Sequence, residues 1–185
     1  MASVSTSMTT KPKFFLLDAM VVSELHAQGI WARFVRTAEI VLPTIIADEA
    51  HCYTAEDRTV HSTHIDRDIA EGRIAVLDCD VEDLQATMNK FDKVLQERLH
   101  PGEVQAITLL LKWENDPPAF CTADFKAIEA TCLLGLAGYL VPMERMLASL
   151  GLSRPVKTQY SEATFKRLMD RAASSRIQGR GLAIR

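Results

Sequence analysis

Several features that identify whole classes of proteins are absent from this sequence. No apolar stretch approaches the roughly 20 residues that a membrane-spanning helix needs. A secretory signal would need an unbroken apolar segment near the N-terminus, but Asp18 interrupts the one that begins there. The four cysteines form no CxxC pair, and Cys121 and Cys132 lie in apolar runs typical of buried thiols. We therefore expect a cytoplasmic protein with no membrane segment, in which residues 1–12 form a disordered tail.

Familiar phosphate-binding and nucleophile motifs are also missing. No glycine-rich loop follows a predicted strand, and no Ser or Cys stands in a nucleophile elbow. A phosphatase of the haloacid-dehalogenase type would need a second aspartate where this chain has Met20, and a receiver domain would need one where it has Ala19. The candidate zinc ligands fit no standard finger spacing; they are His51, Cys52, His61 and His64. A small-molecule phosphatase and a zinc site are therefore minor hypotheses.

The charge is distributed unevenly along the 185 residues. The net charge is −3, and 48% hydrophobic and 24% charged residues are ordinary for a globular protein. Residues 152–185 hold eight Lys or Arg against two acidic residues, a charge of +6, whereas the remainder has 13 basic and 22 acidic residues, a charge of −9. Such a basic segment indicates either a polyanionic partner or a solvated helix that folds back on its own acidic body. We expect one domain over residues 13–151 and a basic helical extension over residues 152–185.

Apolar runs alternate with amphipathic segments along the chain. Phe14–Leu17 are four consecutive apolar residues, which is typical of a strand buried on both faces of a parallel sheet. Further strands are predicted at residues 39–42, 73–77, 119–122 and 138–141. Helices are predicted at residues 18–28, 31–38, 43–53, 81–99, 103–113, 124–134, 142–149 and 161–175, with a charged helix-and-loop segment at 54–72. This alternation predicts an α/β fold: a three-layer α/β/α sandwich with a mostly parallel central sheet of about five strands.

Four carboxylates lie near the expected carboxyl edge of this sheet. Asp18 and Asp124 follow predicted strands. Glu103 opens a helix, and Glu49 lies about two turns into the helix after the second strand. All but Glu49 have a simpler explanation, because acids stabilise the first turn of a helix. Glu49 is mid-helix, so either it or Asp48 is expected to point inward. Gathered together, the four acids would repel one another unless cations bound there, and carboxylate oxygens suit Mg²⁺ or Mn²⁺.

The order of these segments resembles a PIN domain. The resemblance covers residues 13–150 and rests on Phe15–Asp18, Pro43 to Glu49, Pro101–Ile107, Thr122–Ala127 and Leu134–Leu136 in that order. Residues 138–185 are similar to a longer PIN-like subfamily with a helical extension. The resemblance implies a metal-dependent endoribonuclease related to the toxins of bacterial toxin–antitoxin pairs. It implies that the catalytic residues, and the ligands of Mg²⁺ or Mn²⁺, are Asp18, Glu49, Glu103 and Asp124, with in-line attack on the RNA phosphorus by a metal-activated water.

The resemblance also implies partners and leaves one alternative open. RNA would be the substrate, an adjacent antitoxin a protein partner, and a homodimer the assembly. Lys126 is interpreted either as a point charge that binds substrate phosphate or as a solvated helix lysine. Met20 stands where many family members have Ser or Asn, and Asp124 has no acidic neighbour. These departures motivate the alternative, a catalytically degenerate PIN-like module that binds RNA or a protein partner.

Overall fold

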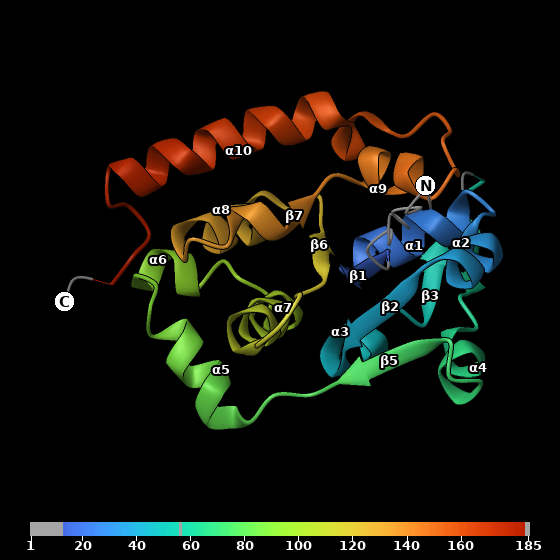
Figure 1. Ribbon diagram of the computed structural model, residues 1–185, viewed down its shortest axis with the longest axis horizontal. Coiled ribbons are helices and arrows are strands. Elements are labelled where there is room, and N and C mark those ends of the chain that lie inside the picture. The colour runs from blue at the N-terminus through green and yellow to red at the C-terminus, as the bar shows by residue number, and fades with distance from the viewer. Residues whose placement is uncertain (1–12, 56, 184–185) are drawn as a thin grey trace, which may run out of the picture.

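The first apolar run forms the middle strand of a five-stranded sheet in the computed structural model, which describes residues 13–55 and 57–183. The strand order is β5-β2-β1-β6-β7, and the neighbouring strands are parallel. The strands are β1 (Phe14–Leu17), β2 (Glu39–Pro43), β5 (Ile74–Leu77), β6 (Ala119–Cys121) and β7 (Leu140–Val141). Helices α1 (Ala19–Ala27) and α2 (Trp31–Thr37) lie on one side of the sheet, and α7 (Pro101–Lys112) and α8 (Phe125–Leu133) on the other (Figure 1). The predicted three-layer α/β/α fold is confirmed.

Burial on both faces explains why the central strands are uniformly apolar. Leu16, Leu17 and Phe120 are fully buried, although neighbouring side chains on a strand point to opposite faces. Cys121 in β6 and Cys132 in α8 are buried free thiols, as their apolar neighbours predicted. The core is therefore continuous through the sheet, and the carboxyl ends of β1 and β6 are held side by side.

The segment after β2 differs from the prediction. Helix α3 (Thr44–Glu49) ends four residues before the predicted limit at Tyr53. It is followed by an antiparallel hairpin, β3 (Cys52–Thr54) with β4 (Val60–Ser62), and by the short helix α4 (Ile65–Ala70). Thr63 ends the helix and closes the hairpin, because its hydroxyl donates to the carbonyl of Ala50 (2.6 Å) and its N–H to that of His51 (3.0 Å). Contacts of this kind, between residues that are separated in the sequence, override a local helical pattern.

The predicted helix over residues 81–99 is also wrong in its continuity. It is divided into α5 (Val81–Met88) and α6 (Lys93–Gln96). Asp92 starts α6 afresh, because its carboxylate accepts the N–H of Leu95 (2.8 Å). Between the two helices, Phe91 is buried and pairs with Leu182 near the C-terminus. The helix is therefore interrupted where this aromatic side chain enters the core.

The basic extension folds back on the domain. Its helix α10 (Glu162–Ile177) packs along α8 and also contacts α9 (Met143–Ser149) (Figure 1). Beyond α10, the N–H of Ala183 donates to the carbonyl of Lys90 (2.9 Å), and Gly181 accepts from Asp92 (2.9 Å). The predicted tail at residues 1–12 lies outside the described residues. Among the helices of the described chain, none combines the length and the apolarity needed to cross a bilayer.

Candidate functional site

Asp18 and Asp124 meet at the carboxyl ends of the adjacent strands β1 and β6. Leu17 pairs with Cys121 in the sheet, and the N–H of Asp18 continues the pairing to the carbonyl of Cys121 (3.2 Å). Asp18 is only 7% exposed, and its Oδ2 accepts a 2.7 Å hydrogen bond from Thr122 Oγ1. Thr122 Oγ1 accepts in turn from the N–H of Asp124 (3.1 Å). One hydroxyl therefore ties the two aspartates together.

Both aspartates also cap helices, as their simpler explanation predicted. Asp124 Oδ1 accepts the N–H groups of Lys126 (2.6 Å) and Ala127 (3.4 Å) at the start of α8. Asp18 Oδ1 accepts a longer bond from Met20 (3.4 Å) at the start of α1. An N-cap aspartate stabilises a helix by about 1 kcal/mol. Capping orients the carboxylates, but it does not explain why Asp18 is buried.

Glu103 brings a third carboxylate to this end of the sheet. It lies in the first turn of α7, is 7% exposed, and its Oε2 accepts the N–H of His100 (3.0 Å). Burial, and then the negative charges of Asp124 and Asp18, raise the pKa of Glu103 to about 7, against the backbone bond to His100 and the charge of Lys126. Burial also raises the pKa of Asp18, which the bond from Thr122 partly offsets and the charge of Asp124 increases. The three acids therefore interact electrostatically.

Glu49 reaches the same region from α3. It is the last residue of that short helix rather than mid-helix, and both it and Asp48 are exposed, so neither is buried in the core. Its Oε2 nevertheless lies 3.4 Å from the position that a Cβ on Gly102 would occupy. The Glu49 carboxylate therefore lies beside Gly102, the residue before Glu103, in the first turn of α7. Glu49 is the exposed member of the four acids.

The donor chemistry of these acids fits a hard divalent cation, but their side chains are not assembled around one. Across residues 13–55 and 57–183, no group of three or more His, Cys, Asp or Glu side chains is arranged to hold a metal ion. Glu103 and Asp124 each use one carboxylate oxygen to accept a backbone N–H group instead. A cation would nonetheless stabilise the ionised forms of Asp18 and Glu103, the two buried carboxylates with raised pKa values. Asp18, Glu103 and Asp124 are the residues that would hold it, with Glu49 beside them.

Two other sequence-level candidates have clear positions. The charge of Lys126, beside the Asp124 cap, lowers the pKa of Glu103, so this lysine stands near the three acids. The candidate zinc ligands make local contacts instead: His51 faces Asp66 (3.7 Å) and His61 contacts Thr59 (2.6 Å). Thr122 is a site residue that the sequence did not predict. A hydroxyl residue between the end of a strand and an aspartate is the signal that could have identified it.

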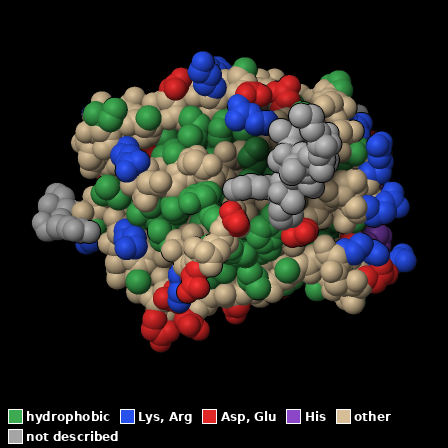
Figure 2. Space-filling model, in the orientation of Figure 1, with side chains coloured by type: hydrophobic (Ala, Val, Ile, Leu, Met, Phe, Trp, Pro, Cys, Tyr) green, Lys and Arg blue, Asp and Glu red, His purple; other side chains and the backbone are tan. Residues whose placement is uncertain are grey.

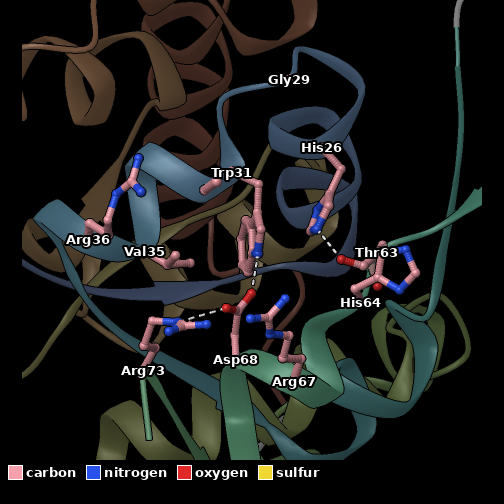
Figure 3. Close-up of a pocket in the computed structure, with 11 residues that line it drawn as sticks. His26, Gly29, Trp31, Val35, Arg36, Thr63, His64, Arg67, Asp68 and Arg73 are labelled. Atoms are coloured by element: carbon pink, nitrogen blue, oxygen red, sulfur yellow. Dashed lines mark hydrogen bonds and ion pairs between the residues drawn. The ribbon is translucent and has the colours of Figure 1, made fainter. Parts of the chain in front are cut away.

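A hollow of about 540 Å³ between α1, α2 and α4 lies apart from the acids (Figure 3). On its floor, Asp68 accepts hydrogen bonds from Trp31 Nε1 (2.7 Å) and Arg73 Nε (2.8 Å). Arg67 and Arg73 both pair with Glu71. Two of the three arginines that line this hollow are therefore already neutralised by carboxylates, which marks it as a structural network.

A scan against models of protein families finds no family that matches, and no curated protein matches the sequence. The function must be argued from these residues alone.

Proposed function

We propose that this protein is a metal-dependent endoribonuclease that hydrolyses RNA phosphodiester bonds. The observation that carries the proposal is the gathering of Asp18, Glu103 and Asp124 at one end of the sheet, where burial, and then the charges of Asp124 and Asp18, raise the pKa of Glu103 to about 7. Perturbed carboxylates gathered at the carboxyl end of a parallel sheet are typical of reactive sites. Mg²⁺ or Mn²⁺, when bound, supplies an activated water and stabilises the charge that develops on the leaving oxygen.

The chain's own residues have distinct tasks in this proposal. Thr122 fixes the carboxylate of Asp18 and shares its hydroxyl with the backbone of Asp124. Glu103 would have to be ionised and to release the N–H of His100 in order to hold a cation, because metal ligation requires the carboxylate form. Lys126 offers a point charge for a substrate phosphate beside the acids.

Cleavage of a labelled single-stranded RNA in the presence of Mn²⁺ tests the proposal. The variants Asp18→Asn, Glu103→Gln and Asp124→Asn should each lose at least roughly 100-fold in rate, the upper end of what loss of a ligand's support costs. Water attack with departure of the 3′ oxygen leaves a 5′-phosphate, whereas a contaminating metal-independent ribonuclease leaves a cyclic phosphate. The chemistry of the product ends thus identifies the activity.

Asp48→Asn is the matched control. Asp48 is an exposed acid next to Glu49 on α3, and its removal changes the net charge by the same amount. It should leave cleavage unchanged, whereas Glu49→Gln should reduce it. Equal rates in the wild type and in the three site variants would contradict the proposal.

A second candidate function is the catalytically degenerate PIN-like module that binds RNA or a protein partner. The arrangement of the acids favours it, because Glu103 is held by its cap and the described acids are not assembled around a cation. This alternative predicts weak or no Mn²⁺ binding in calorimetry, with RNA or partner binding that survives loss of Asp18 and Asp124. Tight Mn²⁺ binding with turnover would exclude it.

The antitoxin and the homodimer stay predictions from the resemblance. Light scattering of the purified protein tests the dimer. Co-purification with the product of a neighbouring small gene tests the toxin–antitoxin assignment.

A further inference from the structure

Three arginines from three segments line a hollow of about 530 Å³ between α6, α8 and α10. Arg98 follows α6, Arg171 lies on α10, and Arg180 follows α10. All three are exposed, and none forms an ion pair within the part of the chain that the structure describes. In Figure 2, Lys and Arg side chains stand on the left of the face, where these helices come together in Figure 1.

The two acids that line this hollow form no ion pair with its three arginines in the described chain, and the arginines outnumber them. Asp92 uses its carboxylate to accept the N–H of Leu95 (2.8 Å), and Glu129 accepts from the hydroxyl of Ser175 (2.6 Å). Arg171 is held by an aromatic ring instead, since its guanidinium lies 4.2 Å from the ring centre of Phe125. The hydrogen-bond donors of the three guanidinium groups therefore remain available to an anion.

The hollow adjoins the carboxylate site. Phe125, on its wall, directly follows Asp124, which caps the same helix. Arg98 stands two residues before His100, whose N–H is bound by Glu103. Two segments that line the hollow therefore continue directly into the carboxylate site, so an extended anionic chain in the hollow would lie close to the acids.

The distribution of charge along the chain explains why a polyanion would need such a surface in order to bind. Residues 1–151 carry −9, and the carboxylates of the site would themselves repel a polyanion. The charge of +6 on residues 152–185 is the part of the chain that attracts a polyanion, and α10 and the segment after it bring Arg171 and Arg180 to the hollow. Arginine suits phosphate oxygens because its planar fork donates two parallel hydrogen bonds.

We propose that this hollow binds the sugar-phosphate backbone of single-stranded RNA and delivers it to Asp18, Glu103 and Asp124. The choice of RNA rests on the proposed ribonuclease function; the anion-binding role of the three arginines does not. The sequence left two interpretations of the basic extension, a helix that folds back on the domain and a segment that binds a polyanion. In this proposal α10 does both.

The test measures RNA binding without cleavage. Anisotropy of a labelled single-stranded RNA is followed in EDTA as salt is varied, for the full chain and for the triple variant Arg98→Gln, Arg171→Gln, Arg180→Gln. Affinity should fall at least roughly tenfold, and the slope of log K against log salt should become shallower by about 2, since each lost phosphate contact on a single strand removes about 0.7. Circular dichroism should be unchanged, because the three side chains are exposed.

A charge-matched triple supplies the control. Arg33→Gln, Arg36→Gln and Lys166→Gln remove the same three charges from exposed positions outside the hollow. This variant should bind RNA nearly as tightly as the wild type. Equal weakening in both triples would overturn the proposal, as would displacement of RNA by polyglutamate at the same charge concentration, which would indicate an acidic protein as the occupant.

The two proposals fail in different ways. Tight RNA binding that depends on the three arginines, without cleavage in Mn²⁺, would refute the ribonuclease and support the RNA-binding hollow. Cleavage with an unchanged KM in the arginine triple would refute the hollow and leave the ribonuclease intact.

Discussion

Thr122 and Asp18 lie 104 residues apart in the sequence, yet the hydroxyl of one donates a 2.7 Å hydrogen bond to the carboxylate of the other. Both are buried, at 3% and 7% exposed. A buried carboxylate with raised pKa is costly to keep ionised, and a short bond to its charged form offsets part of that cost. The pairing of β1 with β6 therefore determines the chemistry of Asp18 as well as its position.

Removal of the Thr122 hydroxyl should affect stability and the acid together. Thr122→Val keeps the volume but leaves Asp18 Oδ2 without this donor and the N–H of Asp124 without its acceptor. We expect a loss of about 1–3 kcal/mol in the free energy of unfolding by urea titration, and weaker Mn²⁺ binding. Thr122→Ser is the control, since it keeps the hydroxyl and should retain both properties. Unchanged stability in Thr122→Val would contradict the role of the hydroxyl, because valine keeps the methyl group of threonine and lacks only the hydroxyl.

Glu103 should make stability fall as pH rises. Its pKa is raised from 4.5 to about 7 in the folded protein, so between these values the folded state holds a proton that the unfolded state has released. Its stabilising contribution is complete below the unfolded value and is lost as pH rises through about 7, by up to about 3 kcal/mol.

Urea titrations at about pH 5 and about pH 8 check this, with Glu103→Gln as the comparison. The free energy of unfolding of the variant should change less with pH across this range, since its amide does not titrate. Mn²⁺ should stabilise the wild type more at the higher pH, because the cation competes with the proton for the carboxylate. The same slope in the wild type and in Glu103→Gln would assign the pH dependence to other groups.

The sequence predicted the sheet better than the segments that connect it. The uninterrupted apolar strands, such as Phe14–Leu17, carry a local signal, and so do the aspartates that cap α1 and α8. The hairpin of residues 52–62 is closed by Thr63, which contacts Ala50 13 residues earlier, and the break at Phe91 depends on Leu182, far along the chain. The arginines of the hollow could not be grouped from sequence either, because Arg98 meets Arg171 only where the start of α6 binds the segment after α10, through the backbone bond from Asp92 to Gly181.

Asp68 should be important for stability and dispensable for RNA cleavage. Asp68→Ala leaves the buried N–H of Trp31 without an acceptor and Arg73 without its closest buried partner (Figure 3). We expect a loss of about 2 kcal/mol, because an unsatisfied buried donor keeps its desolvation penalty. In Trp31→Phe that donor is gone, so Asp68→Ala should cost less in this background. Additive losses in the double variant would show that the bond contributes nothing measurable.

Gly102 links the packing of the fold to the position of Glu49. A Cβ at residue 102 would lie 2.8 Å from Cγ1 of Ile46, which is 1% exposed and cannot move aside freely, and 3.4 Å from Oε2 of Glu49. In an open helix Gly→Ala is favourable by about 1 kcal/mol, but overpacking a core costs about 1–3 kcal/mol, so we expect Gly102→Ala to be destabilising overall. Because α3 must shift to relieve the contact, Mn²⁺ affinity and cleavage should fall, whereas RNA binding in EDTA should not change.

Gly138→Ala provides the comparison, since a Cβ there meets nothing within 4 Å. It should leave stability, Mn²⁺ affinity and cleavage within experimental error of the wild type. If Gly102→Ala lowers the free energy of unfolding but leaves Mn²⁺ affinity intact, Glu49 is an exposed helix-end acid and the site consists of Asp18, Glu103 and Asp124 alone. If both fall together and Glu49→Gln matches the loss of affinity, the end of α3 supplies the fourth carboxylate.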